Sequence, residues 1–139
     1  MSESSDDADA YGCELLVREG RAQVVLREEA SKEFWSLEQR AQAKLLARCK
    51  NWAAGRRLPE EHLNHNEGRA RKGSINRRIE AFKISGVRLF GFVRPLMGFK
   101  TFIAVAVDAA KKQRKANPRV LSRATTRIIE FEEKFGDSV

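Results

Sequence analysis

The 139-residue sequence has few cysteines, few histidines and no long hydrophobic run, and each shortage excludes a class of protein. Two cysteines are too few for a disulfide scaffold, which favours a reducing, cytoplasmic location. The most apolar stretch, residues 102–110, is about half as long as a membrane-spanning helix and contains Asp108. The first ten residues contain four acids and no base, unlike a secretory signal peptide. We therefore expect one folded domain with no membrane segment.

Catalytic motifs are also scarce. The sequence has no glycine-rich phosphate loop, no Gly-x-Ser-x-Gly element and no cysteine and histidine set with zinc spacing. Its two histidines, His62 and His65, lie in a polar stretch without a nearby cysteine, which favours a surface loop over a metal site. We expect no metal and no cofactor. Any polar chemistry then rests largely on lysine and arginine, which suit phosphodiesters.

Charge is distributed very unevenly along the chain. Residues 69–127 contain sixteen bases and two acids, whereas residues 11–68 are almost neutral. Residues 1–10 and 128–139 are acidic, and the polar segment 1–10 is predicted to be a disordered tail. A strongly basic block suggests an anionic partner, of which nucleic acid is the most obvious. An acidic protein, a membrane surface or a solvated basic surface with no partner also fits this composition.

The first half of the chain predicts a hairpin followed by helices. Residues 11–28 contain two short apolar runs around a turn at Gly20, which indicates two strands. Apolar residues then recur at helical spacing to Trp52. A capping box starting at Ser36 would divide this stretch into two helices, 28–36 and 37–54.

The second half predicts a basic loop, a meander of strands and a final helix. Residues 68–78 have no apolar periodicity and are predicted to be a loop. Asn117, Pro118 and Gly136 suit the N-cap, first turn and C-terminal end of a helix. The three predicted strands are 79–84, 87–94 and 99–107. Residues 11–139 are thus predicted to be one α+β domain.

Strand alternation selects candidate site residues but leaves two alternatives open. Arg88, Phe90, Phe92 and Arg94 would share one face of their strand, either as a surface that stacks bases and binds phosphates or as core. Lys83 and Arg88 flank the turn at residues 85–86 and could approach one another, as a site or as a solvated hairpin end.

Two segments carry a resemblance to a known family. The stretch Ile79-Glu-Ala-Phe-Lys-Ile-Ser-Gly-Val-Arg-Leu-Phe-Gly-Phe-Val93 is similar to the central strands of the RelE/ParE toxin superfamily. The stretch Ala110-Lys-Lys-Gln-Arg-Lys-Ala-Asn-Pro118 resembles a Lys-Lys…Lys…Pro segment of its HigB-like and RelE-like branch, which belongs to type II toxin–antitoxin systems. The resemblance spans roughly residues 22–131. It implies a single RelE-like domain over residues 11–139, with a helical hairpin and a C-terminal helix around a mostly antiparallel sheet.

The resemblance also implies a function. RelE-like and HigB-like members are ribosome-dependent endoribonucleases that cleave mRNA by metal-independent attack of the 2′-hydroxyl, with no cofactor. ParE-like members instead bind DNA gyrase. Members are normally neutralised by a cognate antitoxin, so contact with DNA is expected only through an antitoxin or gyrase complex.

Matching positions imply roles for individual residues. Lys83, Arg88 and Lys115 fall on catalytic basic residues of RelE-like toxins, as base or charge stabiliser, phosphate ligand and leaving-group stabiliser. Leu121 stands in the region where such members carry a tyrosine or histidine, which leaves a non-catalytic, partner-binding toxin fold as the alternative. The nucleic-acid-binding candidates are Lys111, Lys112, Arg94 and Arg119.

Overall fold

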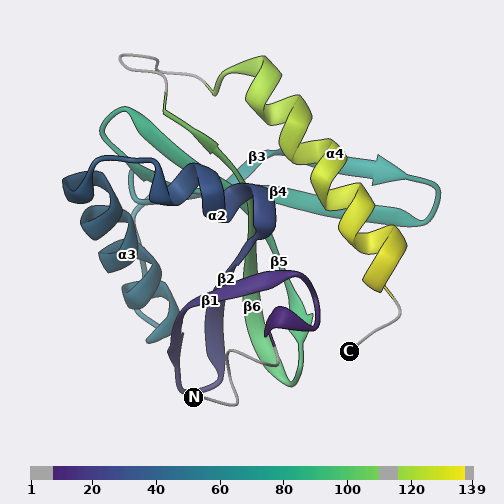
Figure 1. Ribbon diagram of the computed structural model, residues 1–139, viewed down its shortest axis with the longest axis horizontal. Helices are drawn as coiled ribbons and strands as arrows, with labels where there is room; N and C mark the ends of the chain where they lie inside the picture. The colour runs from purple at the N-terminus through teal and green to yellow at the C-terminus, as the bar shows by residue number, and fades with distance from the viewer. Residues whose placement is uncertain (1–7, 110–115, 137–139) are drawn as a thin grey trace.

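The protein is an α+β domain in which helices cover both faces of a mostly antiparallel six-stranded sheet (Figure 1). A computed structural model describes residues 8–109 and 116–136. None of its helices within these ranges is long and apolar enough to cross a membrane. The elements are β1 Cys13–Glu19, β2 Ala22–Arg27, α2 Glu28–Trp35, α3 Gln39–Ala53, β3 Leu63–Lys72, β4 Ile75–Ile84, β5 Val87–Leu96, β6 Phe99–Asp108 and α4 Pro118–Phe135.

The order of strands in the sheet is β1-β2-β6-β5-β4-β3. All neighbours are antiparallel except β2 and β6, which run parallel with Val24 opposite Phe102. The α2–α3 hairpin connects β2 to β3, and it packs on one face of the sheet. The opposite face packs against α4. The predicted N-terminal hairpin, helical hairpin, three-stranded meander and final helix are therefore confirmed.

The predicted basic loop at residues 68–78 is wrong. These residues form the distal half of a long antiparallel hairpin, in which β3 and β4 are joined at Gly73 and Ser74. Gly73 has φ +59°, a conformation that glycine adopts without strain. The strand pattern was concealed because only Ala70 and Ile79 on the distal part of this hairpin are buried beneath α4, whereas most neighbouring residues are charged.

Helix ends show one further correction. The sequence predicted a capping box at Ser36, but Ser36 caps the C-terminus of α2, where its hydroxyl donates to Lys32 O (2.7 Å). The N-cap of α3 is Glu38, which makes no side-chain cap hydrogen bond. At α4 the prediction is confirmed, because Asn117 Oδ1 accepts from Arg119 N (2.9 Å) and Pro118 occupies the first turn.

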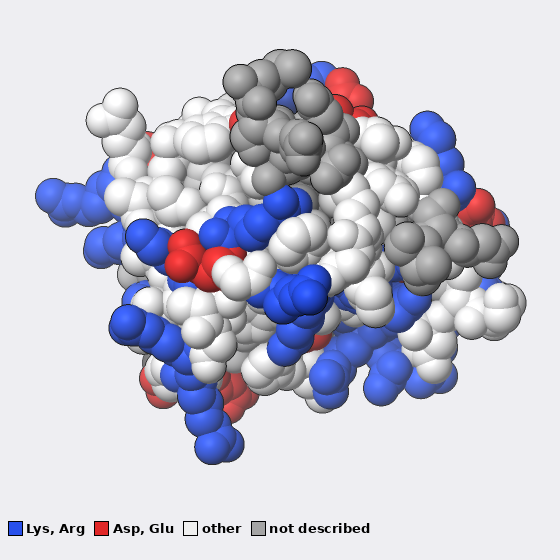
Figure 2. Space-filling view, turned by 90° about the horizontal axis from the view of Figure 1, so that it is seen from below, with Lys and Arg blue, Asp and Glu red and all other residues white. Residues whose placement is uncertain are grey.

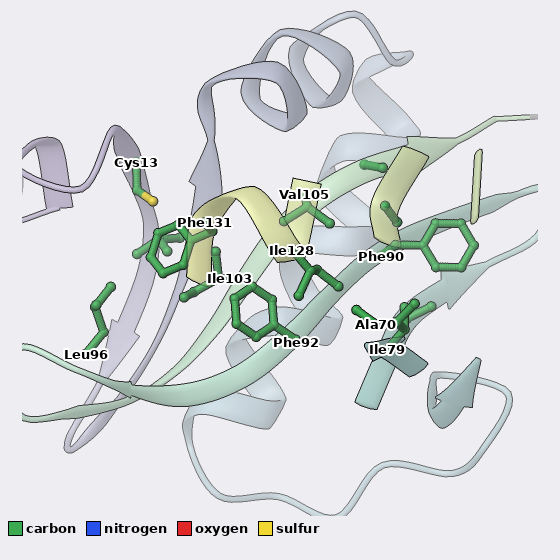
Figure 3. Packing of buried hydrophobic residues seen from close by; sticks show 14 of the residues in the cluster. Cys13, Ala70, Ile79, Phe90, Phe92, Leu96, Ile103, Val105, Ile128 and Phe131 are labelled. Atoms are coloured by element: carbon green, nitrogen blue, oxygen red, sulfur yellow. The ribbon is translucent and has the colours of Figure 1, made fainter. Parts of the chain in front are cut away.

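The core under α4 resolves the question of the aromatic strand face. Phe90 and Phe92 are fully buried and belong to this cluster with Ile128 and Phe131, so they are core residues and not a base-stacking surface (Figure 3).

The buried part of the chain also begins closer to the N-terminus than predicted. Ala8, inside the segment 1–10, already belongs to the same cluster, while residues 1–7 lie outside the described residues.

A β-bulge in β6 shapes this core. Phe90 pairs with Ala106 and Gly91 pairs with Ala104, so Val105 is an extra residue on β6. Val105 and Ala106 consequently both join the cluster under α4. Such a bulge bends the strand and increases its twist. Gly91 is required opposite it, because a Cβ there would lie 2.5 Å from the Phe102 ring.

Candidate functional site

A pocket of about 430 Å³ lies at the β4–β5 turn end of the sheet. Lys83 and Arg88 are direct cross-strand neighbours there, on either side of the turn at Ser85 and Gly86. Gly86 has φ +77°, as the tight turn requires. The sequence prediction that Lys83 and Arg88 approach one another is therefore confirmed. The residues of charged or imidazole type that line the pocket are Arg48, Glu61, His62, Lys83, Arg88 and Asp108.

Arg88 is held by a buried ion pair. Its Nη1 lies 2.8 Å from Glu67 Oε2, and the two side chains are 15% and 5% exposed. Glu67 reaches this position because the register of β3 shifts between Asn64 and Gly68, which gives β3 two residues more than β4 over that interval. Asn64 Nδ2 also donates to Glu67 Oε2 (2.6 Å). The irregularity thus places a fixed carboxylate behind the Arg88 guanidinium.

Lys83 is fixed through its backbone rather than its ammonium group. Its amide N donates to His62 O (2.8 Å), and its carbonyl accepts from Arg48 Nε of α3 (3.3 Å). The side chain is left half-buried at the pocket. Three segments far apart in sequence therefore meet around Lys83: the C-terminal half of α3, the residue before β3 and the end of β4.

Asp108 connects the pocket to α4. It is buried at the end of β6, opposite Arg88 in the sheet register, and its Oδ2 accepts from Asn117 N at the helix N-cap (2.9 Å). The lining therefore combines three cations with two carboxylates and one imidazole. This arrangement can bind an anion through its guanidinium and ammonium groups, with His62 as a further polar residue of the lining.

The remaining predicted site residues do not gather at this pocket. Arg94 is only 3% exposed, and its Nη1 lies 3.0 Å from Glu132 Oε1 of α4. This burial disagrees with its predicted role as a nucleic-acid contact, because the guanidinium is used inside the protein. Arg119 is exposed in the first turn of α4. Lys111, Lys112 and Lys115 lie outside the described residues.

One arginine of α4 and one histidine make contacts away from this pocket. His65 lies in β3, not in a loop, and its Nδ1 is 2.6 Å from Glu80 Oε1. On α4, Arg127 is largely buried and Nη1 contacts Glu33 Oε2 of α2 (3.1 Å) and Val105 O (2.7 Å). No cluster of three histidine, cysteine or acidic residues suited to a metal occurs in the described parts of the chain.

Neither thiol is placed for nucleophilic chemistry. Cys13 and Cys49 are both buried and free. Burial raises the pKa of Cys13 to about 11, and burial also raises the pKa of Cys49. Both thiols are therefore protonated at neutral pH, and the protonated form is a poor nucleophile.

Sequence reasoning missed Arg48, Glu67, His62 and Asp108 as members of this site. Asp108 gave a usable signal, since it is an isolated acid at the end of an apolar strand. Glu67 gave none, because its approach to Arg88 depends on the strand irregularity. Comparisons with protein-family models, curated proteins and solved structures found no match to this chain.

Proposed function

We propose that this chain is a ribosome-dependent endoribonuclease of the RelE-like toxin type, which cleaves mRNA without a metal and is held in check by a cognate antitoxin. The observation that carries the proposal is the pairing of Lys83 with Arg88 in one pocket that His62 also lines. The helical hairpin and C-terminal helix around a mostly antiparallel sheet agree with it. The resemblance of residues 79–93 and 110–118 to RelE-like toxins supplies the choice of substrate.

The proposed reaction is an internal transesterification of RNA. The 2′-oxygen attacks the adjacent phosphorus, the bond from phosphorus to the 5′-oxygen breaks, and the products are a 2′,3′-cyclic phosphate and a 5′-hydroxyl. One proton leaves the 2′-hydroxyl and one is delivered to the departing 5′-oxygen. Acceleration in such a reaction comes mainly from positioning and from fixed charges around the phosphoryl oxygens.

Each residue of the pocket has a role in this scheme. Arg88, oriented by Glu67, binds the non-bridging phosphate oxygens. Lys83 stands beside Arg88 and assists deprotonation of the 2′-hydroxyl by stabilising the negative charge that forms there. His62 exchanges protons at the same pocket. Lys115 keeps only the leaving-group role that the resemblance implies.

The proposal is tested by inducible expression in bacteria with primer-extension mapping of a reporter mRNA. We expect growth arrest and new 5′ ends within the reading frame. Arg88→Ala and Lys83→Gln should each reduce cutting at least about a hundredfold, as loss of a charge stabiliser does in other enzymes. Lys50→Gln is the matched control, because it removes one exposed positive charge from α3.

Two outcomes would contradict the proposal. Cutting that survives both pocket substitutions would remove the catalytic assignment. Arrest with intact mRNA would favour the second candidate, a non-catalytic toxin fold that binds gyrase or another partner. The Arg88–Glu67 ion pair favours that candidate, since a guanidinium already paired with a buried carboxylate can serve a structural purpose. The Lys83→Gln variant distinguishes a catalytic role of the pocket from a structural one, because the Lys83 side chain has no carboxylate partner among the described residues.

A further inference from the structure

The distal β3–β4 hairpin lies beside α4 (Figure 1). Its face that points away from α4 is a second basic surface. Ala70 and Ile79 point into the core under α4, so their alternating neighbours Arg69, Arg71 and Arg78 point to the opposite side. All three are exposed. We call these three residues the hairpin arginine face.

Among the described residues, the three guanidiniums have no acidic partner, and two of them lie directly opposite one another. Arg69 and Arg78 are directly opposite one another in the register, an arrangement of like charges that destabilises a sheet. Within residues 8–109 and 116–136, no carboxylate forms an ion pair with Arg69, Arg71 or Arg78. The nearest acid along β4 on this side, Glu80, is buried and bound to His65. Arg69 Nη1 donates to a neutral acceptor, Asn76 Oδ1 (3.1 Å).

The strands that carry the hairpin arginine face are attached to α4 on their other side. On the other side of the same strands, Lys72 Nζ lies 2.9 Å from Glu133 Oε2, and Arg77 Nε lies 3.3 Å from Glu132 Oε1 of α4. These contacts hold the strands beneath the exposed guanidiniums. A surface that is already ordered loses less conformational entropy when it binds a partner.

We propose that the hairpin arginine face binds the phosphate backbone of RNA, independently of base sequence. Arginine suits this task because its planar guanidinium can contact two phosphate oxygens at once. An acidic protein is a poorer fit, because protein interfaces usually contain an apolar, often aromatic centre. The hairpin arginine face has none: the large exposed apolar side chains of the described residues are Trp35 and Leu46, both in the helical hairpin segment.

The hairpin arginine face is separate from the pocket. Arg78 is five residues from Lys83 along β4, about 17 Å at the rise of a strand, and points to the opposite face. An RNA held here would therefore be contacted away from the bond that is cut. The choice of RNA over another polyanion rests on the proposed function, whereas the presence of an anion-binding surface does not. Figure 2 shows lysine and arginine spread widely over one face of the molecule, which makes a charge-matched control necessary.

The test is fluorescence anisotropy with a short, labelled single-stranded RNA whose 2′-hydroxyls are all methylated. This probe cannot be cleaved by 2′-hydroxyl attack, so binding is measured whether or not the protein is a nuclease. Affinity is followed between about 50 and 200 mM KCl, because each phosphate contact contributes to the slope of log affinity against log salt. The triple variant Arg69→Gln, Arg71→Gln, Arg78→Gln is compared with Arg40→Gln, Lys44→Gln, Lys50→Gln on α3.

We expect the hairpin variant to bind at least about tenfold more weakly and its salt slope to fall by about 2, as loss of three phosphate contacts predicts. The α3 variant carries the same change in net charge and should retain most of the affinity. A protein that binds this RNA through the hairpin but never cuts mRNA would refute the proposed nuclease and not this surface.

Equal losses in the two triple variants would overturn the proposal, because general charge alone would then explain binding. Binding of a polyglutamate probe with the affinity of RNA, and with the same dependence on the hairpin arginines, would overturn the choice of RNA. Thermal unfolding checks that each variant folds. If the triple variant does not fold, Arg71→Gln alone is compared with Lys44→Gln, and the expected difference in slope is about 0.7.

Discussion

Glu132 shows what a single buried carboxylate does in this protein. Its side chain, 6% exposed, receives Arg94 Nη1 at 3.0 Å on Oε1 and at 3.1 Å on Oε2, and Arg77 Nε at 3.3 Å on Oε1. It therefore neutralises part of the charge of two guanidiniums and attaches the end of α4 to β4 and β5. The Arg94–Glu132 ion pair is not a large net source of stability, because the cost of desolvating both charges offsets their attraction. Removing one partner is nevertheless costly, since the other charge would remain buried without a counter-ion.

We expect Glu132→Ala to lower the free energy of unfolding by about 3–5 kcal/mol, because it leaves the buried Arg94 guanidinium without its carboxylate. Urea denaturation measures the loss. Glu133→Ala is the matched control: Glu133 pairs with Lys72, but the two side chains are 47% and 64% exposed. The control should change stability by about 1 kcal/mol or less. Similar small losses in both variants would show that Glu132 is not needed to stabilise the buried arginine.

At the residue scale, the sequence predicted which residues lie close together better than it predicted which are buried and by what. Lys83 and Arg88 were placed together correctly, because a short hairpin fixes which residues are opposite. Arg94 was placed on the correct strand, but strand alternation cannot reveal that α4 covers that face and contributes Glu132. The approach of Glu67 to Arg88 was beyond prediction, since it depends on two extra residues in a neighbouring strand.

At the scale of elements, hydrophobic pattern decided which parts of the fold were foreseen. The helical hairpin and α4 have clear apolar faces, and both were predicted to within a few residues of their observed ends. β3 was missed because its outer residues are mostly charged and its few buried side chains are small or widely spaced. Its strand conformation is imposed by pairing with β4 and by cover from α4.

The bulged centre of the sheet gives the element-scale prediction. Gly91→Ala should destabilise the protein by about 1–3 kcal/mol, because its methyl group would overlap the Phe102 ring and the Ile103 carbonyl opposite the bulge. Thermal unfolding followed by circular dichroism measures the change. Gly73→Asn is the comparison variant. Gly73 has φ +59°, a conformation that asparagine tolerates, and a Cβ added there would have no neighbouring side chain or backbone atom within 4 Å. A Gly91 variant as stable as the Gly73 variant would mean that β6 can shift to admit the methyl group.

At the scale of the whole molecule, the excess of positive charge opposes folding. The chain has 27 basic and 19 acidic residues, and the hairpin arginine face places three cations together. We expect the Tm to rise when KCl is increased from about 50 to 200 mM, because salt screens this repulsion. The rise should be smaller in the triple hairpin variant. A Tm that falls with salt would show that screened ion pairs outweigh the relieved repulsion.

The parallel pairing of β2 with β6 has a consequence for the newly made chain. Val24 of β2 pairs with Phe102 of β6, which lies more than half of the sequence later. One edge of β2 therefore stays unpaired until β6 has been made. Contacts between such distant residues slow folding, because a long loop must close before they form. As the chain leaves the ribosome, the β1–β2 hairpin is therefore complete early but has an open edge. The β6 strand joins the N-terminal hairpin to the β3–β5 meander, so the sheet becomes continuous only after β6 has been made.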